Sequence, residues 1–409
     1  MRKYWKLIVI VPLIVIVIGA FYIKSALSAG SYPEIVFKKE QGDKTAIQDV
    51  VLEGGYYAES FSSELSLTTD GAEFDAGNSF FERISGMYNK RIAALQDKYR
   101  SFMRGKSGTA SSYVETDKVV GYADVINQSF GSRNSDMEFS VAILNKENNE
   151  AVEFSAVVPN RAMYNSVRIQ DVQYVNGELK VITKNIREPS ETTDVNEEIH
   201  VYSFNMEKKE LVDEELIMKT GYEAYTRPLS MSYHYNTSPS QIVIFKKLED
   251  ETVQQQDMKS GAVAQQVKTK VDSITAYNLK TEQKLDVKLP EKLRNQQVLA
   301  VDGSNLYLQS AAEGKMEVIQ YGINQRKITN RFGLDAGDAD SQYLNARATE
   351  VHDGKLYVLF TKGNSPVAQQ LTVVNIGSGE PVYVGEITLE QPSKEKVILN
   401  FFEMSMRSS

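Results

Sequence analysis

The chain has 409 residues, of which 42% are hydrophobic and 24% charged, so it can bury a large core. It contains no cysteine, which excludes a disulfide framework, a thiolate metal site, a cysteine nucleophile and a lipid anchor on cysteine. The formal net charge is −8, and an acidic chain repels phosphate backbones, so no nucleic-acid partner is expected.

An apolar segment near the N-terminus predicts one membrane-spanning helix. Residues Leu7 to Ile23 carry no charge, and at about 1.5 Å per residue they extend about 25 Å, the short end of a spanning helix. Arg2, Lys3 and Lys6 precede the segment, whereas only Lys24 follows closely. The positive-inside rule then places the N-terminus in the cytoplasm and the rest of the chain outside it.

This topology divides the chain into four parts. Residues 1–6 form a cytoplasmic tail, 7–23 a single-pass anchor in the lipid bilayer of the cell membrane, 24–33 a linker, and 34–409 an extracytoplasmic domain. The alternative is a cleaved signal peptide, because small residues at 26–29 suit a cleavage site and would release the domain as a secreted protein.

An amphipathic helix is predicted over residues 79–104. Ser79 and Glu82 form a capping box, and Gly105 can end the helix. Apolar residues follow at helical spacing: Phe81, Ile84, Tyr88, Ile92, Leu95, Tyr99 and Phe102. The stripe is interpreted as docking on the protein's own sheet. The alternative is a docking surface for a partner helix, with Ile92 and Leu95 as contacts.

A strand motif recurs along the second half of the chain. Four segments align without gaps: Val201–Met206, Ile274–Leu279, Val318–Ile323 and Leu371–Ile376. Each is followed within a few residues by a second apolar run, at Leu211, Leu285, Ile328 and Val382. A looser fifth copy covers 141–152. The pattern predicts a strand, a polar turn and a returning strand in each copy.

Tight turns precede three of these copies. Asn176-Gly177, Asp302-Gly303 and Asp353-Gly354 each follow an apolar run and favour a hairpin. Each repeating unit is therefore expected to contribute four strands. The polar, glutamine-rich stretch 251–270 interrupts the spacing and is predicted to be an inserted loop or a short exposed helix.

This repeat resembles that of β-propeller proteins, in which a similar strand and turn recur once per blade. The resemblance covers about 119–389 and implies a fold but no activity. The expected fold is all-β: six or seven four-stranded blades with the inserted helix, after the N-terminal transmembrane helix. Residues 398–404 and 34–37 are expected to close the ring in one blade. The alternative is tandem β-sandwich domains.

Few residues suggest chemistry. No histidine pair has metal-ligand spacing, and no nucleophile elbow or phosphate loop is present. Asp335, Asp338 and Asp340 share a glycine-rich loop that could hold Ca²⁺, with a solvated loop as the alternative. No other cofactor is expected.

The stretch from Gly221 to Asn236 is rich in aromatic residues. Tyr222, Tyr225 and Arg227 are its predicted loop contacts, since aromatic faces beside an arginine can anchor a protein or a sugar. The alternative interpretation is a plain strand.

Three classes of function remain open. The chain is expected to be a binding or accessory module for another envelope or membrane protein, since tethering concentrates a weak binder near such partners. The alternatives are a hydrolase or lyase acting on envelope polysaccharide and an adhesion or structural component.

Overall fold

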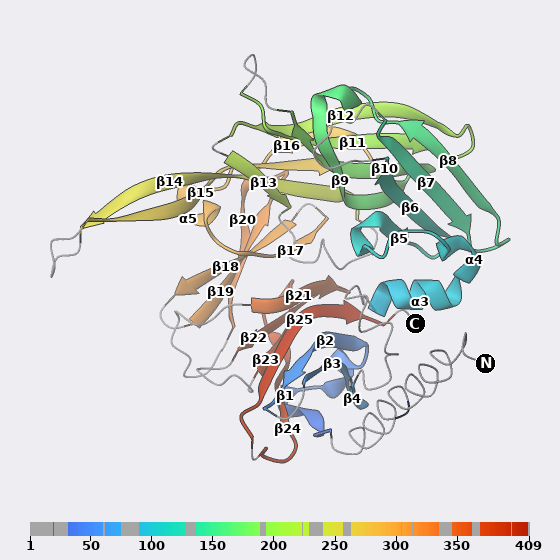
Figure 1. The fold of residues 1–409 in the computed structure, drawn as a ribbon. Helices are drawn as coiled ribbons and strands as arrows, with labels where there is room; N and C mark the ends of the chain where they lie inside the picture. Colours follow the sequence, from blue (N-terminus) through green and yellow to red (C-terminus); the bar gives the residue numbers. More distant parts are fainter. Residues whose placement is uncertain are drawn as a thin grey trace, which may run out of the picture. The chain divides into compact units, whose positions relative to one another are not determined.

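The computed structural model describes residue 19 and residues 32–59, 62–74, 90–127, 136–188, 194–222, 224–228, 240–256, 263–303, 305–312, 315–334, 346–361, 369–393 and 395–407. These residues form a nearly all-β structure of six sheets with few helices (Figure 1). The predicted anchor, apart from residue 19, lies outside them. No helix in the described ranges has the length and apolar character needed to cross a membrane.

Four sheets are antiparallel meanders whose strands follow one another in the chain. The first contains β5 (Tyr113–Glu115), β6 (Val119–Ile126), β7 (Glu138–Asn145) and β8 (Ala151–Val157). The second contains β9 (Tyr164–Val175), β10 (Glu178–Arg187), β11 (Glu197–Asn205) and β12 (Glu210–Thr220). The third contains β13 (Ala224–Pro228), β14 (Ile242–Gln256), β15 (Val263–Asn278) and β16 (Gln283–Asp286). The fourth contains β17 (Val298–Asp302), β18 (Asn305–Ala312), β19 (Lys315–Gly322) and β20 (Lys327–Leu334).

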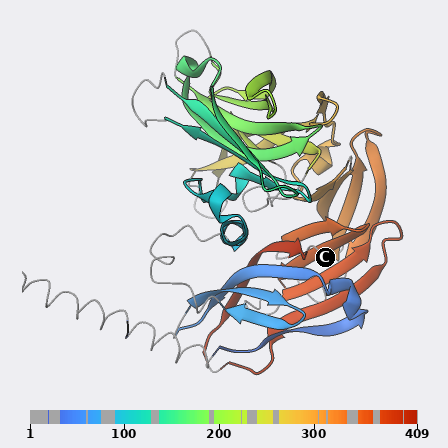
Figure 2. The same cartoon turned by 90° about the vertical axis from the view of Figure 1, so that its right-hand side faces the viewer.

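The other two sheets combine strands from both ends of the chain. One contains β21 (Ala346–His352), β22 (Lys355–Thr361), β23 (Gln369–Asn375) and β24 (Pro381–Leu389), with β1 (Ile35–Gly42) added beside β24. The other contains β2 (Val50–Tyr57), β3 (Ser62–Thr68) and β4 (Gly71–Phe74), with β25 (Ile398–Met406) beside β2. Both views show the red β25 strand running with the blue β2–β4 strands (Figures 1 and 2).

The strand repeat seen in the sequence marks one position in five of the six sheets. The aligned segments fall on β7, β11, β15, β19 and β23, and each of these is the third strand of its meander. The apolar run that follows each of the four gap-free copies falls on the fourth strand. The predicted pairing of strand, turn and returning strand is confirmed in every copy.

The predicted tight turns connect the first and second strands. Asn176 and Gly177 have φ of 54° and 85°, and Asp353 and Gly354 have φ of 48° and 68°. Both central residues of these hairpins thus adopt positive φ, as a two-residue turn between twisted strands requires. Glycine or a short polar residue meets this requirement at low cost.

Residues 251–256 and 263–270 are strands, not the loop or helix that was expected. β14 and β15 pair in continuous register from Glu249↔Lys270 to Gln256↔Val263. They therefore continue as a two-stranded ribbon past the ends of β13 and β16 (Figure 1). The error has a physical cause, because residues 251–256 and 263–268 pair through backbone hydrogen bonds and their polar sequence shows no apolar alternation.

Helix is confined to short segments in the described chain. The predicted helix 79–104 is described from residue 90, as α3 (Lys90–Lys98) and α4 (Arg100–Met103), and its capping box lies outside the described residues. α5 (Glu291–Arg294) and three single turns, η1 (Lys44–Ile47), η2 (Ala110–Ser112) and η3 (Arg161–Met163), complete the list.

The chain divides into two compact units. One comprises Met1–Tyr88, Ser310–Val318 and Arg331–Ser409, and the other Asn89–Gln309 and Ile319–Asn330. In the second unit each sheet packs on the next in chain order. Buried apolar clusters join the first sheet to the second, the second to the third, and the third to residues of the fourth.

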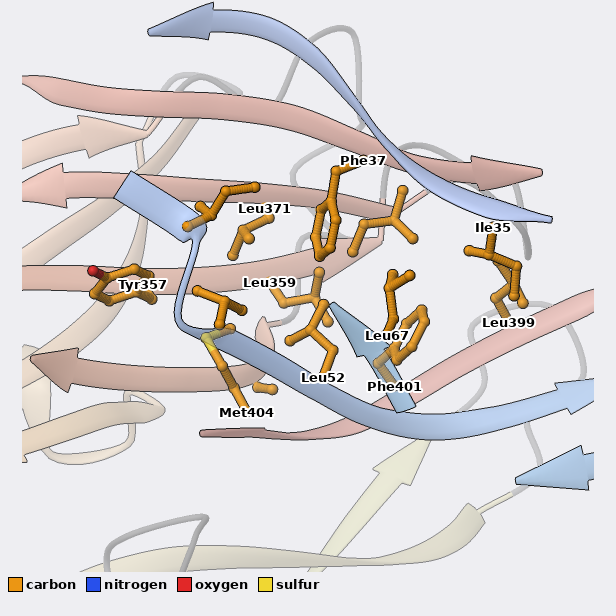
Figure 3. Packing of buried hydrophobic residues seen from close by; sticks show 14 of the residues in the cluster. Ile35, Phe37, Leu52, Leu67, Tyr357, Leu359, Leu371, Leu399, Phe401 and Met404 are labelled. Carbon is orange, nitrogen blue, oxygen red and sulfur yellow. The ribbon is translucent and has the colours of Figure 1, made fainter. Parts of the chain in front are cut away.

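The first unit has its own core between two sheets. Phe37, Leu359 and Leu371 from one sheet meet Leu52 and Phe401 from the other (Figure 3). The C-terminal strand thus completes a sheet begun near the N-terminus. Residues 398–404 and 34–37 were expected to share one blade, and this is wrong: β25 pairs with β2, whereas residues 35–37 pair with β24.

Neighbouring phenylalanines on β25 test this closure. Phe401 is 1% exposed and Phe402 43% exposed. We expect Phe401→Ala to lower the free energy of unfolding by about 3–5 kcal/mol, because it removes a buried ring and leaves a cavity. Phe402→Ala is the matched control and should change it by under about 1 kcal/mol. Urea unfolding of the purified full-length chain measures both, and equal effects would contradict the assigned facing of β25.

Candidate functional site

The short strand β13 is fixed to the second sheet through Thr226. The Thr226 backbone N–H and Oγ1 donate to Glu197 Oε2 at 2.7 and 3.0 Å, and Lys184 Nζ donates to the Thr226 carbonyl at 3.1 Å. Lys184 Nζ also lies 3.0 Å from Glu197 Oε1. Alternation along the strand buries Thr226 and turns Tyr225 and Arg227 to the opposite face.

That face carries an aromatic ring and two cations. The Arg227 guanidinium lies 5.3 Å from the centroid of the Tyr225 ring, in range of a cation–π contact. Lys246 of β14 is directly opposite Arg227 in the antiparallel register, so the two side chains share a face. We call Tyr225, Arg227 and Lys246 the β13 face.

The cations of the β13 face have no counter-ion among the described residues. No carboxylate there forms an ion pair with Arg227 or Lys246. Burial of the half-buried Lys246 side chain, and then repulsion from Arg227, lower the pKa of Lys246. Like charges opposite one another in a sheet destabilise it, so an anion placed between them would relieve that cost.

Two of the three predicted loop contacts, Tyr225 and Arg227, lie on strand β13 and not in a loop. Tyr222 is 48% exposed and precedes β13, while Tyr225 is half-buried and Arg227 exposed. Residues 229–239 lie outside the described ranges. Sequence reasoning missed Lys246, because only the strand register brings it beside Arg227.

The other predicted site residues have different positions. Ile92 and Leu95 are each 3% exposed and pack with Tyr113, Val120 and Leu144 of the first sheet. The chain itself therefore covers the apolar surface of Ile92 and Leu95, as expected if the helix docks on the protein's own sheet. Little of that surface is left for a partner helix to contact. Asp335, Asp338 and Asp340 lie outside the described residues. Within those residues no group of three or more histidine or acidic side chains could hold a metal ion.

A second polar cluster lies inside the β9–β12 sheet. Glu198 accepts hydrogen bonds from Arg187 Nη1 at 2.8 Å and from the Tyr164 hydroxyl at 2.9 Å, and its Oε2 lies 3.1 Å from His200 Nε2. His200 Nδ1 lies 3.0 Å from Glu214 Oε1, though without hydrogen-bond geometry. The cluster joins all four strands of the sheet.

Hydrogen bonds within this cluster stabilise the charged form of Glu198. Burial acts to raise the pKa of Glu198, but the hydrogen bonds from Arg187, His200 and Tyr164 outweigh it, so that pKa lies below its usual value. Burial raises the pKa of the Tyr164 hydroxyl. Because donors surround Glu198 and His200 is only 5% exposed, the cluster stabilises the sheet and offers little surface to a ligand.

Asp171 on β9 is a buried carboxyl that forms no ion pair with a basic residue in the described part of the chain. Gln173 Nε2 donates to its two oxygens at 3.1 and 3.0 Å, and the Val172 N–H donates at 2.9 Å. Burial raises the pKa of Asp171 to about 7, against the lowering effect of these hydrogen bonds. Such a shift is a feature of some catalytic acids, but this side chain is only 4% exposed.

No protein-family model and no curated protein matches this chain. Solved structures show distant likeness. Polysaccharide lyase Uly1 matches at 12% identity and TM-score 0.35, over 68% of this chain and 57% of the lyase. A structure from a study of two prolyl endopeptidases matches at 10% identity and TM-score 0.35, over 88% of this chain and 50% of that one.

A third likeness is to the β-propeller domain of the Trilobed protease from Pyrococcus furiosus, at 12% identity and TM-score 0.28, over 72% of this chain and 94% of that domain. The chain spans 57% and 50% of the length of the first two structures. Because these TM-scores lie below 0.5, the functional argument rests on the residues of the chain itself.

The raised pKa of Asp171 predicts a distinct pH dependence of stability. Between pH 4 and 7 the folded chain keeps a proton that the unfolded chain has lost, so stability falls as pH rises through this window. We expect the wild type to lose about 2–3 kcal/mol relative to Asp171→Asn between pH 5 and pH 8.

Urea unfolding at each pH measures the free energy of unfolding of the wild type and of Asp171→Asn. The contributions of the other titrating groups cancel in the difference between the two. The exposed Asp97→Asn variant is the control and should run parallel to the wild type. A wild-type curve parallel to that of Asp171→Asn would contradict the assignment.

Proposed function

We propose that the chain is a membrane-anchored, extracytoplasmic, β-propeller-like binding or accessory protein that acts on or with another envelope or membrane protein. The β13 face supports this proposal most directly. It presents an ordered aromatic–cationic pair on a strand fixed by Glu197 and Lys184, and its cations lack a carboxylate partner in the described chain. Fixed tyrosine and arginine side chains are typical anchors of protein interfaces.

The propeller part of the proposal rests on topology. Consecutive strands form each meander, and each sheet of the second unit packs on the next in chain order. A β-sandwich with Greek-key connections would instead mix strands from distant parts of the chain in both sheets. Completion of one sheet by β25 supports six blades closed by the two ends of the chain.

Membrane anchoring rests on the sequence. The uncharged run Leu7–Ile23 and the positive residues before it support a single-pass anchor with the body outside the cytoplasm. Tethering near the bilayer would raise the local concentration of the β13 face around membrane proteins, so modest affinity would suffice.

Asp171 is the observation that favours a hydrolase or lyase as the second candidate. A carboxyl with a pKa of about 7 could act as a general acid. Its hydrogen bonds to Gln173 and Val172 and its burial speak for a structural role, so binding is the preferred proposal.

Crosslinking in cells tests the binding proposal. A photo-reactive amino acid in place of the exposed Tyr222 should capture one defined envelope or membrane protein. Tyr225→Ala and Arg227→Ala should each reduce capture about tenfold or more, because truncating an interface anchor costs about 2 kcal/mol. Arg347→Ala removes an exposed arginine from β21 and serves as the control. Capture that is absent, or unchanged by both β13 variants, would contradict the proposal.

A further inference from the structure

The β13 face has a charge arrangement that specifies the chemistry of its partner. Arg227 and Lys246 lie opposite one another on neighbouring strands, and the Tyr225 ring beside Arg227 limits the directions in which the guanidinium can point. Thr226, held on the other side of β13 by Glu197 and Lys184, fixes the backbone that carries both Tyr225 and Arg227. The two cationic groups are thus pre-positioned before any ligand arrives.

Lys247, the next residue on β14, is a lysine that has carboxylate partners. Lys247 Nζ lies 3.3 Å from Glu249 and 3.1 Å from Asp272, and these hydrogen bonds raise its pKa against the opposing effect of burial. Lys246 has no such carboxylate among the described residues, and burial and Arg227 lower its pKa. Lys246 and Lys247 are adjacent on β14, but only Lys247 has a carboxylate partner among the described residues. An incoming anion would supply that partner to Lys246.

We propose that Arg227 and Lys246 form a binding site for a single carboxylate side chain of the protein partner, an inference that rests on the proposed binding function. A planar guanidinium can hold both oxygens of a carboxylate, and the ammonium of Lys246 can donate to one of them. The Tyr225 ring beside Arg227 would flank that carboxylate with apolar surface.

The charge of the chain favours one carboxylate over a polyanionic surface. Anionic lipid surfaces are typically recognised by clusters of about four to eight basic residues, whereas this face has two. The net charge of −8 would also repel an extended polyanion. A single acidic side chain satisfies both cations without that repulsion.

Lysine NMR on the full-length chain, purified in phosphatidylcholine nanodiscs, tests the inference. The lysines are labelled as ¹³C-dimethyl derivatives, and the Lys246 signal is assigned by its loss in Lys246→Gln. Acetate, the probe for a carboxylate, should shift the Lys246 signal saturably and raise the pKa of Lys246. Chloride at equal ionic strength should produce no saturable shift.

Two comparisons make the result specific. The Lys247 signal is the matched internal control and should not respond to acetate, because Glu249 and Asp272 already occupy that lysine. Arg227→Gln should weaken acetate binding about tenfold or more, since it removes the two-point contact. An unresponsive Lys246, or an equal response of Lys247, would overturn the site.

Further arms separate the carboxylate from other sources of negative charge. Inorganic phosphate should bind no more tightly than acetate. A Lys246 shift that appears on adding phosphatidylglycerol to the nanodisc, and not on adding acetate, would overturn the carboxylate and indicate a lipid surface. Acetate binding together with failure to capture a partner at Tyr222 would retain the anion site and overturn the proposed function.

Discussion

The structure depends on sheets whose central strands are buried on both faces. All residues of β11 from Glu197 to Phe204 are buried, and in β23 all but Asn375 are buried. Tyr202 packs in the cluster shared with the first sheet, while Val201 packs in the cluster shared with the third. A sheet of this kind cannot stand alone, because either face left in water would cost its hydrophobic burial. Each sheet therefore needs neighbours, and in the second unit the following sheet of the chain supplies them.

The same constraint explains what the sequence could predict. The third strand of a meander has the strongest apolar demand, so its aligned copies were detectable in β11, β15, β19 and β23. Turns that need positive φ, such as Asn176-Gly177, were equally visible. By contrast, β2–β4 carry no aligned copy of the motif and were not predicted. The extension of β14 and β15 was predicted wrongly, because its polar strands pair through backbone hydrogen bonds and leave no apolar pattern.

The candidate site was likewise predicted only in part from the sequence. Tyr222, Tyr225 and Arg227 were predicted from composition, since aromatic residues beside an arginine stand out in the chain. Lys246 could not be predicted, because its relation to Arg227 depends on the register of β13 on β14. The internal partners of Ile92 and Leu95 were anticipated by the stripe of α3, but the sheet that covers them was not identifiable from spacing.

Charged side chains in the described chain have two kinds of environment. Lys180 is buried but lies 2.7 Å from both Glu178 and Glu282 and 2.8 Å from the Ser203 hydroxyl. Glu198 is likewise enclosed by donors. The partners of Lys180 and Glu198 offset the free-energy cost of removing these charges from water. The β13 face differs, since its two cations find no carboxylate in the described residues, and that contrast distinguishes it from the structural clusters.

The pairing of the two chain ends in one sheet is the central claim, and an engineered disulfide tests it directly. Val51 of β2 and Ser405 of β25 are directly opposite in the register, and the natural chain has no cysteine to interfere. The account predicts that Val51→Cys with Ser405→Cys forms an intramolecular disulfide on mild oxidation, seen as a faster-migrating monomer in a non-reducing gel. Val51→Cys with Ile398→Cys places the thiols about 20 Å apart along the strands and should not. Equal crosslinking of the two pairs, or none in the first, would contradict the account.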